Sequence, residues 1–256
     1  MQYEMIELIY DGDYATITMN SPERRNALSM QHMLELTAAF NEVGDSNVRG
    51  VYLAANGHAF SAGHDFRDMA GQDLVFMRKM MKTCVNLMDT IQAIPQPVLA
   101  RVHALATAAG CQLVATCDLA VAADTVGFAT PGGKGGWFCF TPMVAVSRQI
   151  GRKRAAEMLF TGDVIDAKTA YEWGLINRVV TADKLLEESE KLMLAATRGS
   201  FWSKGIGKQA FYAQIDLEQP KAYSYSMEVM AATSQTPDAQ EGMSAFLEKR
   251  KPNFQR

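Results

Sequence analysis

The sequence predicts an α/β fold, with a core of alternating strands and helices followed by an α-helical C-terminal part. Short apolar runs such as Val98–Val102 and Leu119–Ala123 alternate with helical patterns through the first two-thirds of the chain. From Phe201 onward every signal is helical. Within the core, residues 100–142 combine strand candidates, a run of small residues and a glycine-rich loop at 130–136. We expect the rest of the core to be organised around this stretch.

The N-terminal part is predicted to form a hairpin, a helix and a strand. Residues 6–10 and Tyr14–Met19 alternate apolar and polar positions on either side of an Asp-Gly-Asp turn, which predicts a β-hairpin. Ser29 is expected to cap a helix that runs to about Gly44. Gly50–Ala55 is the next predicted strand.

The clearest periodic pattern predicts a long helix that Pro95 and Pro97 end. Its apolar positions are spaced by 3, 4, 3, 4 and 3 residues: Leu74, Met77, Met81, Cys84, Met88 and Ile91. The methionines could form an adaptable binding face. Core packing is the simpler interpretation.

The second half is predicted to be mainly helical. Helices are expected over residues 143–150, 153–160, Ala167–Trp173 and 181–196, with a short strand at Arg178–Val180. Asp166 can cap the third of these helices and Gly174 can stop it. Pro237 is typical of a helix start.

Composition excludes several classes of function. The chain has 256 residues, of which 48% are hydrophobic, enough for one large domain or two small ones. A net charge of −3 argues against nucleic acid as a partner. The N-terminus lacks a signal-peptide pattern and no stretch is long enough to span a bilayer, so we expect no membrane partner.

The cysteine pattern predicts reduced thiols and a cytoplasmic location. The four cysteines form no CxxC pair and have no histidine-rich neighbourhood: Cys84, Cys111, Cys117 and Cys139. Such cysteines are typical of buried, unpaired thiols, and no metal site is expected.

Two turns of small residues are the candidate ligand-binding features. One spans residues 104–110 and leads into a helix, and the other, Ser61 to Phe66, follows the strand Gly50–Ala55. Small residues let the backbone approach a ligand and direct free N–H groups at it, and such groups stabilise oxyanions. Ligands gather where strands end in α/β sheets. For a small-residue run alone, a tight helix–sheet contact is the alternative interpretation.

Four sequence blocks resemble those of the enoyl-CoA hydratase/isomerase family, the crotonase superfamily. They are Arg24-Arg25-Asn26-Ala27-Leu28, Ser61-Ala62-Gly63-His64-Asp65-Phe66, Ala109-Gly110-Cys111-Gln112-Leu113 with Cys117-Asp118 behind it, and residues 241–252, EGMSAFLEKRKP. The blocks occur in the family's order and at similar spacing across nearly the whole chain. One block alone would be weak, but four in register are specific.

The resemblance implies a crotonase-like spiral of ββα units whose helical C-terminal region forms trimers. We therefore divide the chain into an α/β core, residues 1–195, and a helical C-terminal region, residues 196–256. Homologous function would place the protein in fatty acid metabolism as a lyase or isomerase, assembled as a homotrimer or a dimer of trimers. A coenzyme A thioester would be its substrate or ligand, and no cofactor is implied.

The resemblance also assigns site residues. Family members hold the thioester oxygen with two backbone N–H groups, which by alignment of the blocks belong to His64 and Ala109. Arg24 and Arg25 would contact coenzyme A phosphates, although two solvated surface arginines are the alternative. The remaining contacts to coenzyme A and substrate would come from Ala27, Leu28, Ala62, Gly63, Asp65, Phe66 and Gly110, and from Phe246 and Lys249 of a neighbouring subunit.

The family's two catalytic glutamates have no counterpart in this chain. Their positions correspond to Gln112 and Gly132, and a carboxylate that some members carry further on would fall near Phe140. Neither an amide nor a glycine can transfer a proton near neutral pH. We therefore expect ordinary enoyl-CoA hydration to be slow or absent. Restoring both glutamates is expected to raise hydration if the pocket is otherwise intact.

Other proton-transfer groups have structural alternatives. His64 and His103 border the candidate turns and titrate in the right range, but hydrogen-bonded structural histidines are common. Cys139 could be a nucleophile, although an inert buried thiol is the simpler interpretation. The resemblance makes Asp118 structural.

Two classes of function remain. The chain is either an enzyme that stabilises an enolate-like state of an acyl-CoA thioester, or a non-catalytic acyl-CoA-binding protein that has lost the catalytic acids. Turnover of crotonyl-CoA would distinguish them.

Overall fold

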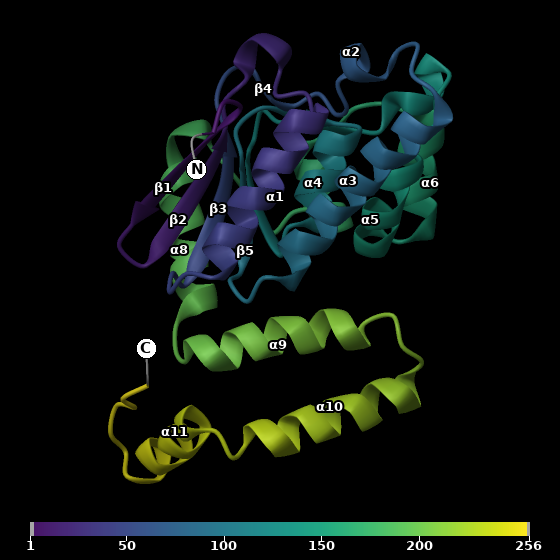
Figure 1. Cartoon of the computed structure of the whole chain (residues 1–256). Coiled ribbons are helices and arrows are strands. Elements are labelled where there is room, and N and C mark those ends of the chain that lie inside the picture. The colour runs from purple at the N-terminus through teal and green to yellow at the C-terminus, as the bar shows by residue number, and fades with distance from the viewer. Residues whose placement is uncertain (1–2, 255–256) are drawn as a thin grey trace.

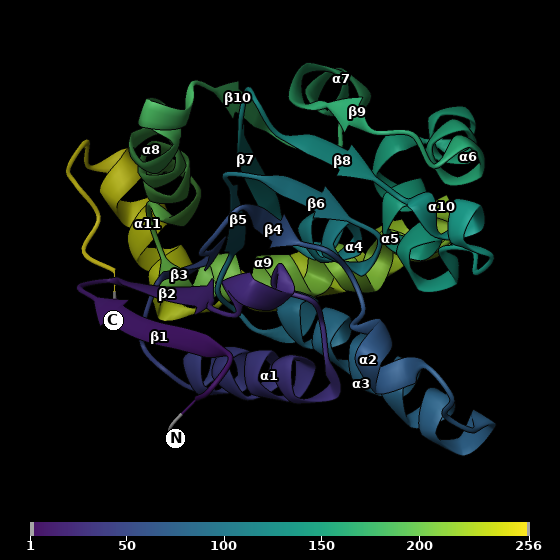
Figure 2. The same ribbon diagram turned by 90° about the horizontal axis from the view of Figure 1, so that it is seen from above.

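The computed structural model describes residues 3–254, which form two β-sheets surrounded by helices (Figures 1 and 2). The first sheet has six strands in the order β1-β2-β3-β5-β7-β10. They are β1 (Ile6–Asp11), β2 (Tyr14–Met19), β3 (Gly50–Ala55), β5 (Val98–Val102), β7 (Leu119–Ala123) and β10 (Arg178–Val180). The second sheet has the order β4-β6-β8-β9. Its strands are β4 (Ala59–Ser61), β6 (Leu105–Thr107), β8 (Gly127–Ala129) and β9 (Ile165–Asp166).

Pairs of strands followed by a helix recur along the chain. β3, β5 and β7 pair in parallel in the first sheet, and the short strands that follow them, β4, β6 and β8, pair in parallel in the second. A helical segment follows each second strand. The core is therefore a spiral of ββα units, as the family resemblance predicts.

Helices pack against one another around the sheets. They are α1 (Met30–Gly44), α2 (Phe66–Met69), α3 (Leu74–Ala93), α4 (Ala109–Thr116), α5 (Phe140–Ile150), α6 (Arg152–Thr161), α7 (Ala167–Trp173) and α8 (Leu185–Thr197). α3 packs on α1 and α4, and α5 packs on α4 and α6. The interior includes Phe40, Phe60 and Phe128, all fully buried, so one apolar core joins the helices to both sheets.

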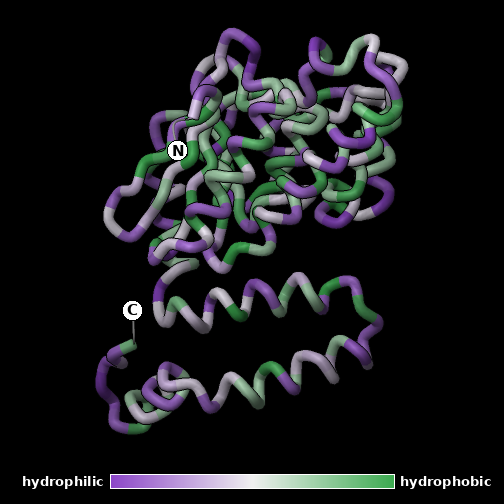
Figure 3. The backbone as a smooth tube through the Cα atoms, in the orientation of Figure 1, coloured by the Kyte–Doolittle hydropathy of each residue, from purple (hydrophilic) through white to green (hydrophobic). Residues whose placement is uncertain are grey.

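The C-terminal helices form a separate layer beneath the core in Figure 1. They are α9 (Phe201–Gln214), α10 (Gln219–Thr233) and α11 (Pro237–Leu247). In Figure 3, hydrophobic residues are concentrated within the core, whereas this layer alternates hydrophobic and hydrophilic positions along its length. The predicted boundary between residues 195 and 196 falls inside α8 and stays a prediction.

A buried polar cluster fastens α9 to the core. Lys208 Nζ donates to Asp118 Oδ2 at 2.7 Å and to the carbonyl oxygens of Ile91 and Gln96 at 2.7 and 2.8 Å. Tyr212 donates its hydroxyl to the other oxygen of Asp118 at 2.8 Å. Burial lowers the pKa of Lys208, with Asp118 opposing the shift. The cluster thus gives Asp118 a structural role.

The local signals locate most elements correctly. The hairpin, β3, β5, β7 and β10 occur where they are predicted, and Ser29 and Asp166 accept hydrogen bonds as N-caps of α1 and α7. Two helix starts differ. α5 begins at Phe140 rather than 143, and a short 3₁₀ turn, Ala182–Lys184, precedes α8.

The predicted apolar stripe of α3 is partly wrong. Leu74 is exposed, and Met77 and Met81 are only half-buried, whereas Met80 and Leu87 are buried in the core. Figure 2 shows the reason, because the first turns of α3 project beyond the sheets.

The strands of the second sheet have only two or three residues, which is too short for an alternation of apolar and polar positions to predict them.

Candidate functional site

Three parallel strands of the second sheet end at one edge, and a cavity of about 450 Å³ lies there. β4, β6 and β8 end at Ser61, Thr107 and Ala129. Their carboxyl ends meet because the strands are parallel. The cavity is lined by Ala27, Ala62, His64, Asp65, Phe66, Met81, Ala108, Ala109, Gly132 and residues 137–142. It brings together residues from three of the four sequence blocks.

The Arg24–Leu28 block forms one wall because it docks along the turn after β4. Leu28 N donates to Gly63 O at 2.7 Å, and Ala62 N donates to Arg25 O at 3.0 Å. Asn26 has a positive φ of 50°, and its side-chain amide donates to Ala59 O at 2.9 Å. A short polar side chain tolerates this conformation and fixes the loop.

The turns that carry His64 and Ala109 are in close contact. Gly63 has a φ of +88°, and a Cβ at this position would lie 2.8 Å from Ala108 Cβ and 3.1 Å from Ala109 N. A Cβ on Gly110 would lie 2.4 Å from Ser61 O. Only glycine allows both approaches, because any side chain would separate the turns.

The amide groups of His64 and Ala109 are available to a ligand. Ala109 is the first residue of α4, so its N–H has no partner within that helix. The isolated parallel β-bridge between Leu28 and His64 uses the N–H groups of Leu28 and Asp65 as donors. It does not use the N–H group of His64. Within residues 3–254, neither amide donates a hydrogen bond. Ala108, which precedes α4, has the positive φ of 52°.

The two positions that the family resemblance assigns to catalytic glutamates differ in their surroundings. Gln112 is 4% exposed and lies behind the cavity wall, where Cys84 Sγ is 4.0 Å from its Oε1. Gly132 lines the cavity, but a Cβ there would be 2.3 Å from Trp137 O. The expectation that glutamates at both positions would raise hydration stays a prediction, and its condition of an unchanged pocket is not met at residue 132, because a side chain there requires the backbone near Trp137 to shift.

His64 and His103 occupy different environments. His103 Nε2 lies 2.7 Å from Gly57 O, and His103 does not line the cavity. His64 lines the cavity, but both of its ring nitrogens are buried and so do not face the open space. Burial lowers the pKa of His64 below its ordinary value of 6.5, and the Leu28 backbone opposes the shift. The ring is therefore neutral at pH 7.

Cys139 lies at the cavity wall as a buried thiol. Gly132 N donates to its Sγ at 3.3 Å. Burial raises the pKa of Cys139, and this N–H opposes the shift. All four cysteines are unpaired and buried.

The two arginines assigned to coenzyme A are not equivalent. Arg24 Nη1 lies 3.3 Å from Asp65 Oδ2, while the other oxygen of Asp65 accepts from Arg67 N at the start of α2. Arg25 is exposed and makes no ion pair within the described part of the chain. Phe66 is also exposed, at the rim of the cavity. Arg25 is thus the freer cation.

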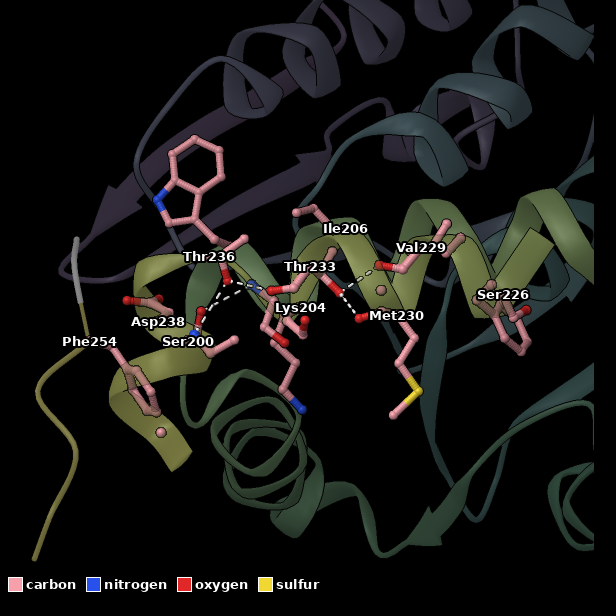
Figure 4. A pocket seen from close by; sticks show the side chains of 18 of the residues that line it. Ser200, Lys204, Ile206, Ser226, Val229, Met230, Thr233, Thr236, Asp238 and Phe254 are labelled. Carbon is pink, nitrogen blue, oxygen red and sulfur yellow. Dashed lines mark hydrogen bonds between the residues drawn. The ribbon is translucent and has the colours of Figure 1, made fainter. Parts of the chain in front are cut away.

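Phe246 and Lys249 are not brought to the cavity within one chain. Phe246 lies on α11 and is 82% exposed, and Lys249 follows that helix. In Figure 1, α11 lies below the core and α2 above it. A larger cavity of about 710 Å³ separates α9, α10 and α11, with Lys204, Met230 and Phe254 among its walls (Figure 4). No predicted site residue lines this larger cavity.

The sequence analysis missed the apolar wall of the cavity. Trp137, Phe138, Phe140 and Thr141 form it with Met81 of α3. The aromatic run directly after the glycine-rich loop is the signal that could have identified it.

Within residues 3–254, no group of three or more histidine, cysteine or acidic side chains could hold a metal, and no helix has the length and apolarity needed to cross a membrane.

Comparisons with known proteins agree with this architecture. The family model described as enoyl-CoA hydratase/isomerase matches residues 11–256. The chain is 42% identical over 240 residues to the Xenopus laevis enoyl-CoA hydratase domain-containing protein 3, mitochondrial, covering 92% of this chain and 81% of that protein.

Two solved structures show the same fold. An enoyl-CoA hydratase from Mycobacterium smegmatis has a TM-score of 0.95 and 43% identity, with 98% of each chain covered. The human enoyl coenzyme A hydratase domain-containing protein 3 has a TM-score of 0.94 and 38% identity, covering 98% of this chain and all of that one.

The comparisons also correct the expected location. Curated relatives from frog, rat and human carry the word mitochondrial in their names, which contradicts the predicted cytoplasmic location. The prediction is wrong because it depended on reduced thiols, and buried unpaired thiols do not distinguish one reducing compartment from another.

Proposed function

The chain belongs to the enoyl-CoA hydratase/isomerase family, and we propose that it acts on an acyl-CoA thioester by stabilising an enolate-like intermediate. The amide groups of His64 and Ala109 would bind the thioester oxygen as negative charge develops on it. The observation that carries the proposal is that two amides, neither with a partner among residues 3–254, lie close together at the wall of an apolar cavity.

Backbone donors are suited to this task because they do not reorganise during the reaction. Loss of one such donor costs about 3–4 kcal/mol of transition-state stabilisation in characterised enzymes. The contact between Gly63 and the Ala108–Ala109 turn would fix the separation of the two donors. The chemistry would belong to the lyase or isomerase class, with a role in fatty acid metabolism.

Ordinary hydration is not part of the proposal. Gln112 and Gly132 supply no carboxylate, and Asp65, the acidic residue in the cavity wall, is paired with Arg24. This scarcity of acids favours the second candidate, a non-catalytic acyl-CoA-binding protein. Enolate chemistry is the better candidate, because simple binding does not require two free amides beside the same cavity.

The ligand site would be completed by a neighbouring subunit. We propose a homotrimer or dimer of trimers in which Phe246 and Lys249 reach coenzyme A bound to another copy. The exposure of both residues and the place of α11 below the core in Figure 1 support this arrangement. No cofactor is proposed besides the coenzyme A of the substrate.

A pair of glycine variants tests the proposed oxyanion site. Gly63→Ala would push the two turns apart, so we expect exchange of the protons next to the carbonyl of butyryl-CoA in D₂O to fall by about a hundredfold. Gly71→Ala is the control, because Gly71 also has a positive φ, +76°, but a Cβ there meets nothing within 4 Å. Equal exchange rates in the two variants would contradict the proposal.

A further inference from the structure

A second cavity lies between the first sheet and α8, and the proposed function makes no use of it. Its volume is about 690 Å³, and its walls come from β1, β2, β3, β5 and α8. In Figure 2, α8 lies beside β5 and β7, on the side away from β6 and β8. This α8 cavity shares no lining residue with the cavity at His64 and Ala109, so it is a separate site.

The pleat of the first sheet places polar side chains on the floor of the α8 cavity. Thr16 of β2 pairs with Tyr52 of β3, and Tyr52 pairs with Leu99 of β5. Arg101 follows Leu99 by two residues, so its side chain lies on the same face of the sheet as that of Tyr52. Thr16, Tyr52 and Arg101 all line the cavity.

Arg101 carries a positive charge that no other described residue pairs with. Its guanidinium carbon lies 4.4 Å from the centre of the Tyr52 ring, so the cation stacks on the tyrosine. Its Nε is buried without a hydrogen-bond partner. The two Nη atoms also make no hydrogen bond or ion pair within residues 3–254, but they are accessible from the cavity. Burial lowers the pKa of Arg101, and Tyr52 and Glu190 oppose the shift.

The Tyr52 hydroxyl is a second free donor in the same cavity. It has no hydrogen-bond partner among the described residues, and it is accessible. Burial raises the pKa of Tyr52 to about 12, so the hydroxyl keeps its proton at neutral pH. The Tyr14 ring packs against Tyr52 with the ring centroids 5.8 Å apart, and the Tyr14 hydroxyl is hydrogen-bonded to Thr197. A stacked guanidinium and a fixed hydroxyl are preorganised to bind an anion.

The charges around the cavity fit an anion with a single negative charge. Lys191, the other cation in the wall, is paired with Glu187 at 2.6 Å. Asp11 and Glu190 line the cavity and are exposed, and neither forms an ion pair with Arg101. Arg101 is therefore the unpaired cation among the described residues of this cavity. A dianion would be repelled more strongly than a monoanion by the two carboxylates.

Apolar side chains supply another part of the walls. Ile9, Leu186 and Leu194 line the cavity, and each is more than half exposed. A hydrocarbon chain bound against them would remove apolar surface from water. A concave site with apolar walls and a few free polar groups is typical of small-molecule binding.

We propose that the α8 cavity binds a small monocarboxylate with an aliphatic chain. The carboxylate oxygens accept hydrogen bonds from the Nη groups of Arg101 and from the Tyr52 hydroxyl, and the chain lies against the apolar walls. Glu190, on α8, is the competing carboxylate of the chain itself, because its charge acts on both Arg101 and Tyr52.

Octanoate is the probe, and calorimetric titration measures its binding. Wild-type protein should bind one octanoate per chain. Acetate lacks the hydrocarbon chain and octanol lacks the charge, so each should bind at least about tenfold more weakly. Saturating butyryl-CoA should leave octanoate binding unchanged, because the two cavities share no residue. Displacement by butyryl-CoA, or equal affinities for the three probes, would overturn the inference.

Substitutions in the cavity test the assigned contacts. Arg101→Gln should weaken octanoate binding by about 10–100-fold, and Tyr52→Phe, which keeps the stacked ring, by about threefold to tenfold. Arg152→Gln, an exposed arginine at the start of α6, is the control and should keep the wild-type affinity.

Glu190→Gln separates a ligand site from an ion pair within the chain. Octanoate should bind about threefold more tightly to this variant, because a like charge is removed. If Glu190 were the permanent partner of Arg101, the variant would instead melt at a lower temperature and octanoate would bind no better, which would overturn the inference. Affinity within about threefold of the wild type in Arg101→Gln would also overturn it. So would a changed sedimentation coefficient in that variant, because the face would then be a contact between copies. If Arg101→Gln does not fold, unchanged affinity in both Tyr52→Phe and Glu190→Gln is the contradicting result.

Discussion

Residue 132 shows how closely packed backbone can exclude a catalytic side chain. A Cβ on Gly132 would lie 2.3 Å from Trp137 O and 3.1 Å from Cys139 N, and backbone atoms cannot rotate aside. The path of the 130–140 loop therefore leaves no room for an acidic side chain at this position. A substitution must move that loop before it can present any functional group.

Gly132→Ala should lower the free energy of unfolding by about 1–3 kcal/mol, because overpacking forces a backbone shift. Gly135→Ala in the same turn is the matched control, since its Cβ would meet nothing within 4 Å. Urea unfolding measures both variants. Equal stability of Gly132→Ala and Gly135→Ala would show that the loop adapts freely. A side chain with a carboxylate could then be accommodated at residue 132.

The two arginines of the first block should respond differently to substitution. Arg25→Gln should weaken coenzyme A binding by about threefold to tenfold and leave dephospho-coenzyme A unaffected, because the proposed contact of this exposed cation with the 3′-phosphate would be screened by solvent. Arg24→Gln should affect both ligands alike, since its guanidinium holds Asp65 at 3.3 Å. Calorimetric titration of both ligands is the measurement. The assignment fails if wild-type protein binds both with equal affinity.

Sequence blocks predicted which residues of the site meet, but not how much space they leave. Residues Ala62–Phe66 and Ala108–Ala109 follow strand ends, so their meeting follows from the parallel topology. The room at Gly132, the pairing of Arg24 with Asp65 and the burial of the His64 ring nitrogens depend on contacts between distant segments. No local pattern encodes those contacts.

At the scale of elements, local sequence patterns predicted the strands of the first sheet but not those of the second. Five strands of the first sheet have five or six residues and carry apolar runs long enough to predict, and β10, with three, was also predicted, whereas the second sheet is built of strands of two or three. These short strands carry the site because their ends meet at the cavity. Caps at Ser29 and Asp166 were predictable because an N-cap is a local hydrogen bond.

The buried cluster on α9 should account for much of the attachment of the C-terminal layer. Lys208→Met leaves the Asp118 carboxylate buried without its cation, so the free energy of unfolding should fall by about 3 kcal/mol. This is the low end for a broken buried pair, because Tyr212 and Val98 N still donate to Asp118. Lys204 is exposed on the same helix, and the control variant Lys204→Met should change the free energy of unfolding by less than about 0.5 kcal/mol. If urea unfolding shows no difference between these variants, the buried cluster does not hold α9 to the core.

At the scale of the whole molecule, the C-terminal layer exposes large apolar side chains. Each of the following is more than half exposed in the single chain: Trp202, Phe211, Met227, Met230, Phe246 and Leu247. Exposed apolar side chains gathered in one layer are typical of an interface. This layer is therefore the expected site of assembly.

Sedimentation velocity should show a trimer or a dimer of trimers. Phe211→Glu combined with Met230→Glu should dissociate the oligomer, because two negative charges without partners would be buried in the interface. The affinity for acyl-CoA should fall as the oligomer dissociates. Tyr171→Glu, an exposed aromatic substitution on α7, is the control and should leave the oligomer intact. A stable monomer that binds acyl-CoA with full affinity would contradict the shared site.

The most direct measurement compares two reactions of the unmodified protein. Butyryl-CoA is incubated in D₂O and followed by mass spectrometry, and hydration of crotonyl-CoA is followed in parallel. If the amides of His64 and Ala109 bind the oxyanion as proposed and no carboxylate assists, deuterium is expected next to the carbonyl, with little or no hydration. Rapid hydration would show that a proton-transfer pair exists despite Gln112 and Gly132. Tight binding with no deuterium incorporation would instead establish a non-catalytic acyl-CoA-binding protein.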